Sequence, residues 1–97
     1  MTLLNTLREQ RSQILAIAAK HGAFNVRVFG SVVRGEDTPE SDIDFLIDYA
    51  LENVKPWFPG GLLMDLQDLL GRKVDVLTER GISPLMRERV LAEAKPL

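Results

Sequence analysis

Residues 29–48 read FGSVVRGEDTPESDIDFLID. A Gly-Ser dipeptide at 30–31 ends one apolar run, and Asp42 and Asp44 stand at the start of the next. Aspartate is disfavoured in strands, and two carboxylates on one face repel each other unless a cation lies between them. The stretch therefore predicts two strands joined through a turn, with a charged site where they meet.

The apolar pattern on either side of this stretch predicts a small α/β domain of the α+β type. Helical spacing and end signals predict four helices, at 3–20, 31–35, 62–70 and 83–94. Short and alternating apolar runs predict three strands, at 25–29, 42–48 and 73–78. Gly22 lies where the first helix needs a C-terminal cap. The order is therefore αβαβαβα, and we expect residues 1–97 to form a single domain.

The directions of the strands follow from where the polar residues lie. The dipeptide at 30–31 ends the first strand and Asp42 begins the second, so they meet only if these strands are antiparallel. Asp75 lies near the start of the third strand, which must then run parallel to the second. We expect a mixed three-stranded sheet packed by helices, with the site along one edge of the sheet.

Composition restricts the classes of function. The 97 residues are 45% hydrophobic and 27% charged, with a net charge of −2, and the pI is about 5.3. Such acidity argues against strong nucleic-acid binding. We expect no membrane association, because no apolar run approaches the roughly 20 residues of a membrane span and no signal peptide is visible. The absence of cysteine excludes disulfides, zinc-thiolate sites and thiol nucleophiles, and it fits a reducing compartment such as the cytoplasm.

Asp42 and Asp44 are the first candidate metal ligands. Successive strand residues point to opposite faces, so these two share one face, with Cα atoms about 6.6 Å apart. Carboxylates so placed can converge on two divalent ions about 3.5–4 Å apart, and hard oxygen ligands favour Mg²⁺ or Mn²⁺. Asp48 shares the face but lies too far along the strand to join them. The alternative is that Asp42 caps the strand and Asp44 is merely solvated.

Asp75 supplies a third carboxylate. It stands between Val74 and Val76, where an aspartate is unfavourable unless it is paired or metal-bound. Taken alone, it is better explained as an exposed residue on an edge strand. Together with Asp42 and Asp44 it completes the set that two-metal phosphoryl transfer requires, in which the third acid accepts the proton of an attacking hydroxyl.

Gly30 and Ser31 are the candidate phosphate-binding residues. A glycine lets the backbone approach a ligand closely, and a serine that opens a short helix offers its hydroxyl beside free N–H groups. The alternative is an ordinary strand-to-helix turn with a serine cap. A P-loop is excluded, because Glu36 and Asp37 stand where that motif needs lysine and serine or threonine.

The combined pattern resembles the nucleotidyltransferase superfamily related to DNA polymerase beta. The superfamily motif joins Gly-Ser to Asp-x-Asp through a spacer, which is residues 32–41 here, and a further carboxylate on a later strand is matched by Asp75. The fuller wording GSVVRG…SDIDFLID is similar to the minimal nucleotidyltransferases, called MNT proteins, and the likeness covers nearly the whole chain. The resemblance implies the nucleotidyltransferase fold.

The resemblance also implies a role for each acid. Asp42 and Asp44 would bind both Mg²⁺ ions of a two-metal in-line mechanism, with Mn²⁺ as a possible substitute. Asp75 would bind one ion and help to deprotonate the acceptor.

Further roles follow from the resemblance for residues beside the acids. Gly30 and Ser31 would hold the phosphates of ATP. Arg34 matches an arginine of the family pattern and would orient the loop or neutralise phosphate charge; a salt bridge with an acidic neighbour is an equal alternative. Ser41 would cap or orient Asp42.

The resemblance to minimal nucleotidyltransferases also implies that the protein is a prokaryotic antitoxin. Its implied partner is a HEPN-family toxin, in a type VII-like module. The implied activity is transfer of AMP from ATP to a tyrosine hydroxyl of the toxin, which inactivates it. Because the nucleotide-binding core uses up nearly all of the 97 residues, we expect the acceptor to dock as a separate protein. The alternatives are neutralisation by binding alone, and transfer to a small molecule or an RNA end.

Three residues outside the motif require an interpretation. Trp57 and Phe58, between two prolines, form a candidate docking loop, since aromatic residues are enriched at interfaces. Packing of both rings on the domain's own core is the slightly preferred alternative. For His21, the only histidine, we expect a surface or capping role rather than catalysis.

Overall fold

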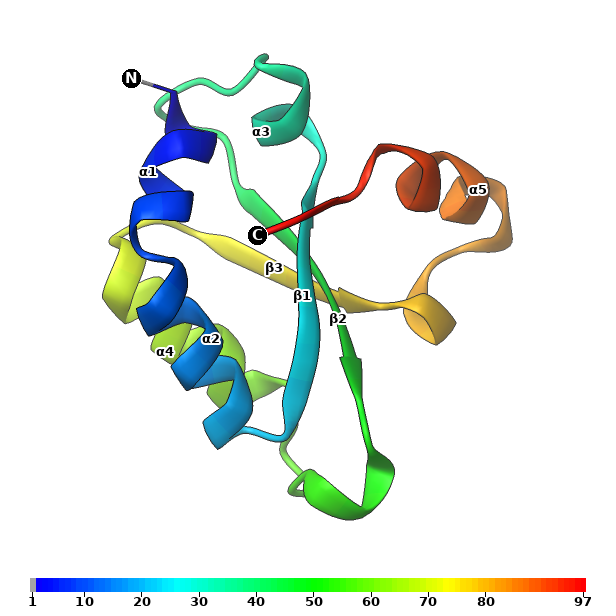
Figure 1. Cartoon of the computed structure of the whole chain (residues 1–97). Coiled ribbons are helices and arrows are strands. Elements are labelled where there is room, and N and C mark those ends of the chain that lie inside the picture. Colours follow the sequence, from blue (N-terminus) through cyan, green and yellow to red (C-terminus); the bar gives the residue numbers. More distant parts are fainter. Residues whose placement is uncertain (1) are drawn as a thin grey trace.

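The computed structural model describes residues 2–97 and contains a mixed four-stranded sheet. The strands are β1 (Ala23–Phe29), β2 (Ile43–Tyr49), β3 (Val74–Thr78) and β4 (Lys95–Pro96). Their order is β3-β2-β1-β4, and Figure 1 shows the first three crossing the middle of the molecule. β1 and β2 are antiparallel, whereas β2 and β3 are parallel, so both predicted directions are confirmed.

The fourth strand corrects the predicted count of three. Lys95 and Pro96 pair with Val28 and Arg27 of β1 in antiparallel register. Two residues are too short to show alternation, and proline is normally a signal against a strand. Proline is tolerated here because β4 is an edge strand.

Five α-helices and two short 3₁₀ turns surround the sheet within residues 2–97. The helices are α1 (Leu3–Glu9), α2 (Arg11–Lys20), α3 (Ser31–Arg34), α4 (Gly60–Leu70) and α5 (Pro84–Glu93); the 3₁₀ turns are η1 (Leu51–Asn53) and η2 (Glu79–Gly81). The predicted single helix at 3–20 is divided at Gln10. The sequence does not show this division, because the apolar stripe continues through Leu7 and Ile14, which are both buried. The Ile14 N–H still donates to the Gln10 carbonyl across the division.

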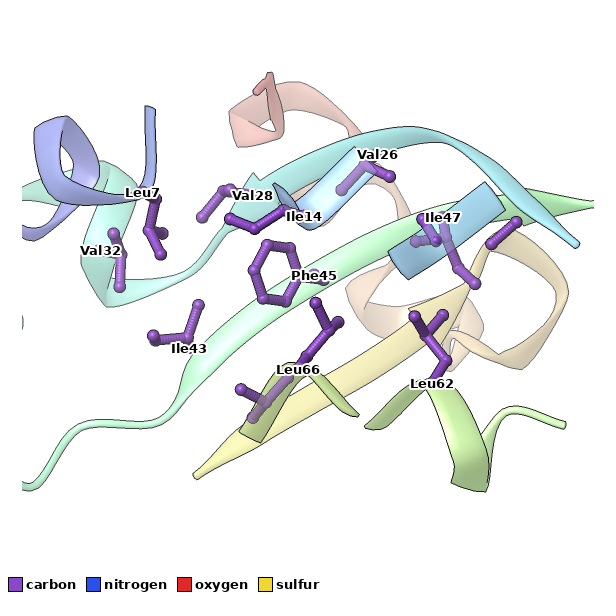
Figure 2. Packing of buried hydrophobic residues seen from close by; sticks show 13 residues of the cluster. Leu7, Ile14, Val26, Val28, Val32, Ile43, Phe45, Ile47, Leu62 and Leu66 are labelled. Atoms are coloured by element: carbon purple, nitrogen blue, oxygen red, sulfur yellow. The ribbon is translucent and has the colours of Figure 1, made fainter. Parts of the chain in front are cut away.

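One face of the sheet packs against α1, α2 and α4 and forms the main core (Figure 1). Figure 2 shows Phe45 in the middle of this core, between Ile14 and Leu66. Ile43 and Ile47 are buried with Phe45, so the predicted packing face of this strand is confirmed. The residues between them, such as Asp44, therefore face the opposite side of the sheet.

The opposite face of the sheet is covered by α5 and the segment before it. A second, smaller cluster joins Phe29 and Leu46 of the sheet to Ile82 and Val90. Val90 is the one buried residue of α5, so this helix is held by little apolar contact. None of the helices in residues 2–97 is both long and apolar enough to cross a membrane.

Replacing Gly22 by alanine is expected to destabilise the fold by about 2–4 kcal/mol. Gly22 ends α2 with a φ of 82°, which an L residue rarely adopts, and an added Cβ would overlap the Asn53 carbonyl oxygen. Urea denaturation measures the loss. Gly71→Ala is the matched control, since Gly71 has a φ of 64° but open space around it, and it should lose only about 1 kcal/mol. Equal losses of stability in the two variants would show that the contact between the added Cβ and the Asn53 carbonyl oxygen contributes nothing.

Candidate active site

Of the six predicted site residues, all but Asp75 line one pocket beside α5, on the face of the sheet opposite the main core. Asp44 is the second residue of β2, and its neighbours across the sheet are Phe29 of β1 and Asp75 of β3. Asp42 immediately precedes β2. Together with Gly30 and other residues, Asp42 and Asp44 line one pocket of about 460 Å³. The predicted meeting of the turn with the two aspartates is therefore confirmed.

The carboxyl group of Asp44 carries the clearest electrostatic signal in the pocket. Burial first, and then the negative charges of Asp75 and Asp42, raise its pKa from 3.8 to about 6. The nearby charge of Arg34 acts in the opposite direction, and that of Glu93 adds a small further rise. A carboxyl surrounded by acids in this way is stabilised in its charged form by any cation that binds beside it.

Gly30 is required by its contact with Asp44. Its φ of 79° and ψ of −154° place it outside the range of most L residues. An added Cβ would overlap Oδ2 of Asp44. The glycine therefore allows the turn between β1 and α3 to lie directly against the Asp44 carboxylate. The sequence predicted close approach to a ligand, whereas the contact found here is with a side chain of the site itself.

Arg34 and Glu93 link the turn to α5. The Gly30 N–H donates to Glu93 Oε1 over 2.8 Å, and Arg34 Nη1 donates to both Glu93 oxygens over 3.0 Å. Arg34 Nε donates to Glu36 Oε1 over 2.8 Å. These two carboxylates, Glu36 first, raise the pKa of Arg34. Of the two interpretations of Arg34, the salt bridge with an acidic neighbour is present, and contact with phosphate stays a prediction.

Glu93 was missed by sequence reasoning. Its partners Arg34 and Gly30 lie 59 and 63 positions earlier in the chain. One signal was available, because Glu93 is the last residue of α5. A negative charge at a helix C-terminus is unfavourable with the helix dipole unless a cation compensates it.

The loop before Asp42 is held by two further groups. The hydroxyl of Ser41 accepts from the Thr38 N–H over 2.8 Å, so Ser41 orders the loop rather than bonding to Asp42. Arg72, which sequence reasoning also missed, donates through Nη2 to the carbonyls of Thr38 and Ser41, over 2.7 and 2.8 Å. These contacts set the direction from which the chain enters β2.

The three acids fit a divalent cation by their chemistry more than by their positions. All are carboxylates, and after burial, which is the larger cause, the charges of Asp75 and Asp42 contribute to the raised pKa of Asp44. However, Asp75 is exposed, and Asp42 Oδ2 lies 3.7 Å from Lys73 Nζ. Within residues 2–97, no group of three or more histidine, cysteine, aspartate or glutamate residues is placed to hold a metal ion. The assignment of Asp42, Asp44 and Asp75 as metal ligands stays a prediction.

Two other polar residues lie outside this pocket. Asp48 accepts from Arg27 Nη2 over 2.8 Å and from Asn25, which agrees with its predicted separation from the acids. His21 caps α2 and forms a 2.7 Å hydrogen bond with Asp65 of α4, as expected for a structural histidine.

The two aromatic residues of the predicted docking loop behave differently. Phe58 packs against the core, and its ring lies 5.0 Å from that of Tyr49. Trp57 is 63% exposed. The core interpretation is therefore confirmed for Phe58 and wrong for Trp57.

Known proteins are similar to this chain in sequence and in fold. The sequence model of a family described as "Nucleotidyltransferase domain" matches residues 11–97. A protein of Methanocaldococcus jannaschii, which carries the provisional name protein adenylyltransferase MJ0435, is 37% identical over 93 residues, covering 91% of this chain and 94% of the relative. A solved structure provisionally described as a minimal nucleotidyltransferase has a TM-score of 0.83 and 46% identity, covering 100% of this chain and 97% of the other.

A more distant structure shares the fold alone. It is described as a toxin–antitoxin with AMP-PNP, and it has a TM-score of 0.72 at 22% identity. The likeness covers 88% of this chain and 69% of the other chain.

Proposed function

Because the chain belongs to the nucleotidyltransferase domain family, we propose that this nucleotidyltransferase moves AMP from ATP to a tyrosine hydroxyl of a HEPN-family toxin and so acts as its antitoxin. The observation that carries the proposal is that Asp42 and Asp44 line one pocket with Gly30, which lies against the Asp44 carboxylate. The charge of Asp75, on the neighbouring strand, also acts on Asp44. A relative named as a protein adenylyltransferase supports a protein acceptor. The toxin–antitoxin structure with AMP-PNP supports a nucleotide and a toxin as the two substrates.

The acids would perform the chemistry. Asp42 and Asp44, with Asp75 beside them, would hold Mg²⁺ or Mn²⁺, which when bound supplies positive charge to the phosphoryl oxygens and to the attacking and leaving oxygens. Asp75 is exposed on β3 and would accept the proton of the tyrosine hydroxyl. The tyrosine oxygen then forms a bond to the α-phosphorus, the bond to pyrophosphate breaks, and pyrophosphate leaves with its electron pair.

The turn would hold the nucleotide. Ser31 lies in the pocket and would offer its hydroxyl to a phosphate. The Gly30 N–H is already used by Glu93, so Gly30 would contribute shape more than a hydrogen bond. Arg34, paired with Glu36 and Glu93, would orient this turn.

We expect the partner toxin to gain mass in units of AMP when it is incubated with this protein, ATP and Mg²⁺. Intact mass spectrometry of the partner measures the gain, and omission of Mg²⁺ or addition of EDTA should abolish it. Transfer to a small molecule or an RNA end instead would disprove a protein acceptor. A stable complex of the two proteins without any mass gain would favour neutralisation by binding alone.

A further inference from the structure

We infer that Glu93 is a positioning residue of the transfer site, which fixes the Gly30 turn and the Arg34 guanidinium beside Asp44. The inference rests on the proposed nucleotidyl transfer for its catalytic meaning. It gives the last helix, α5, a direct role at a pocket whose motif residues all lie between β1 and β3.

The contacts of Glu93 are short and partly shielded from solvent. One of its oxygens accepts from the Gly30 N–H at 2.8 Å and from Arg34 Nη1 at 3.0 Å, while the other accepts from Arg34 Nη1 at 3.0 Å. The side chain of Glu93 is only 19% exposed. Hydrogen bonds between charged groups are stronger than neutral ones, and partial burial reduces screening by solvent.

These contacts hold a turn whose shape matters to the chemistry. Gly30 lies against the Asp44 carboxylate so closely that even a methyl group would collide with it. A small shift of the turn would therefore change the space available to the Asp44 carboxylate and with it the position of that carboxylate. Since Glu93 binds the N–H of Gly30 itself, it acts directly at a residue that lies against Asp44.

The same contacts place α5 as a wall of the pocket. Apart from Glu93, α5 reaches the sheet chiefly through the buried Val90. It nevertheless presents Met86 and Arg89 to the pocket that contains Asp44. Figure 1 shows α5 standing on the opposite side of the sheet from α1 and α4. A helix with so little apolar anchoring depends on its polar contacts for its exact placement.

Arg34 is the second group that Glu93 fixes. Arg34 is the cation whose charge acts on Asp44, and its guanidinium is held between Glu36 and Glu93. Without Glu93, the guanidinium would keep one partner and gain freedom to move. The position of the positive charge that acts on Asp44 therefore depends on a carboxylate from α5.

The test compares Glu93→Ala with Glu88→Ala, which removes an exposed glutamate from the same helix. Two quantities are measured on each folded variant: the hydrogen-exchange rate of the Gly30 amide by NMR, and the affinity for AMP-PNP by calorimetry. We expect Glu93→Ala to speed exchange at Gly30 and to weaken AMP-PNP binding, each by about tenfold. Glu88→Ala should leave both unchanged.

A conservative variant separates positioning from mere stability. Glu93→Gln keeps an oxygen for the Gly30 N–H but loses the charge that pairs with Arg34. We expect its Gly30 exchange to stay near that of the wild type, while AMP-PNP affinity falls by an intermediate amount. If Glu93→Ala folds, as circular dichroism would show, and both quantities stay within twofold of the wild type, the inference is wrong.

The proposed function can fail separately. If Glu93→Ala changes Gly30 exchange and AMP-PNP affinity as expected but the wild type modifies no protein, the positioning role stands and the acceptor is wrong. If the wild type does not bind AMP-PNP at all, the proposed transfer is wrong. In that case the Gly30 exchange rate alone decides whether Glu93 holds the turn.

Discussion

Replacing Asp44 by asparagine is expected to lower nucleotidyl transfer by about a thousandfold or more, because a lost metal-binding charge removes several kcal/mol of transition-state stabilisation. Asp44 lies at the centre of the site, since Asp42 and Asp75 both act on its charge and Gly30 lies against its carboxylate. The side chain of asparagine has nearly the same shape, so the fold should be preserved. Initial rates of AMP transfer to the partner protein measure the loss.

The same variant should be more stable than the wild type in the absence of metal. The pKa of Asp44 is about 6 in the folded protein against an ordinary value of 3.8. The folded state therefore binds more protons between these values, so its stability falls as pH rises from about 4 to about 6 and stays lower above that range. For a partly exposed group, the loss is about 1–2 kcal/mol.

Urea denaturation in EDTA at two pH values tests this sign. At pH near 4, the wild-type carboxyl is protonated, and Asp44→Asn should be about as stable as the wild type. At pH near 7.5, the free energy of unfolding of the variant should exceed that of the wild type by the same amount, about 1–2 kcal/mol. Equal stability at both pH values, or a less stable variant at the higher one, would contradict the electrostatic strain at Asp44.

Asp48→Asn is the matched control on the same strand. Asp48 pairs with Arg27, whose side chain is only 12% exposed, and it lies outside the pocket that contains Asp44. This variant should keep most of its transfer activity and lose stability at pH 7.5. The two variants are therefore expected to change stability in opposite directions, and only Asp44→Asn is expected to lose transfer activity, which separates a functional carboxylate from a structural one.

The sequence was sufficient for the directions of β1, β2 and β3, because one requirement determined them. Gly30, Asp42 and Asp75 could meet only if β1 and β2 were antiparallel and β2 and β3 were parallel. The pairing of Phe29 with Asp44, and of Asp44 with Asp75, meets this requirement. Residues that must act together thus carry long-range information that hydrophobic periodicity alone does not.

The groups that support the site were not predictable in the same way. Glu93 and Arg72 act through partners that are distant in the chain, and neither belongs to a local motif. β4 is too short to show a pattern, and it becomes a strand only because the edge of β1 is free to pair with it. The exposure of Trp57 beside the packed Phe58 likewise depends on how residues 55–61 fold back on the domain.

Gly30→Ala is expected to reduce transfer by about a hundredfold and to destabilise the fold by about 2–4 kcal/mol, combining backbone strain with overpacking. The added methyl group would collide with Oδ2 of Asp44, so either the carboxylate or the turn must move. Moving the turn would also stretch the hydrogen bond from the Gly30 N–H to Glu93. Transfer rates and urea denaturation measure the two effects.

The collision can be separated from the backbone strain by two further variants. Gly35→Ala has the same kind of backbone problem at a φ of 72°, but open space surrounds it, so it should cost only about 1 kcal/mol. In Gly30→Ala/Asp44→Ala, the colliding oxygen is absent, and the double variant should be more stable than the sum of the single effects by about 1–3 kcal/mol. Strict additivity would mean that Gly30 and Asp44 do not compete for the same space. A favourable coupling would establish that this glycine is required by the carboxylate beside it, independently of any bound nucleotide.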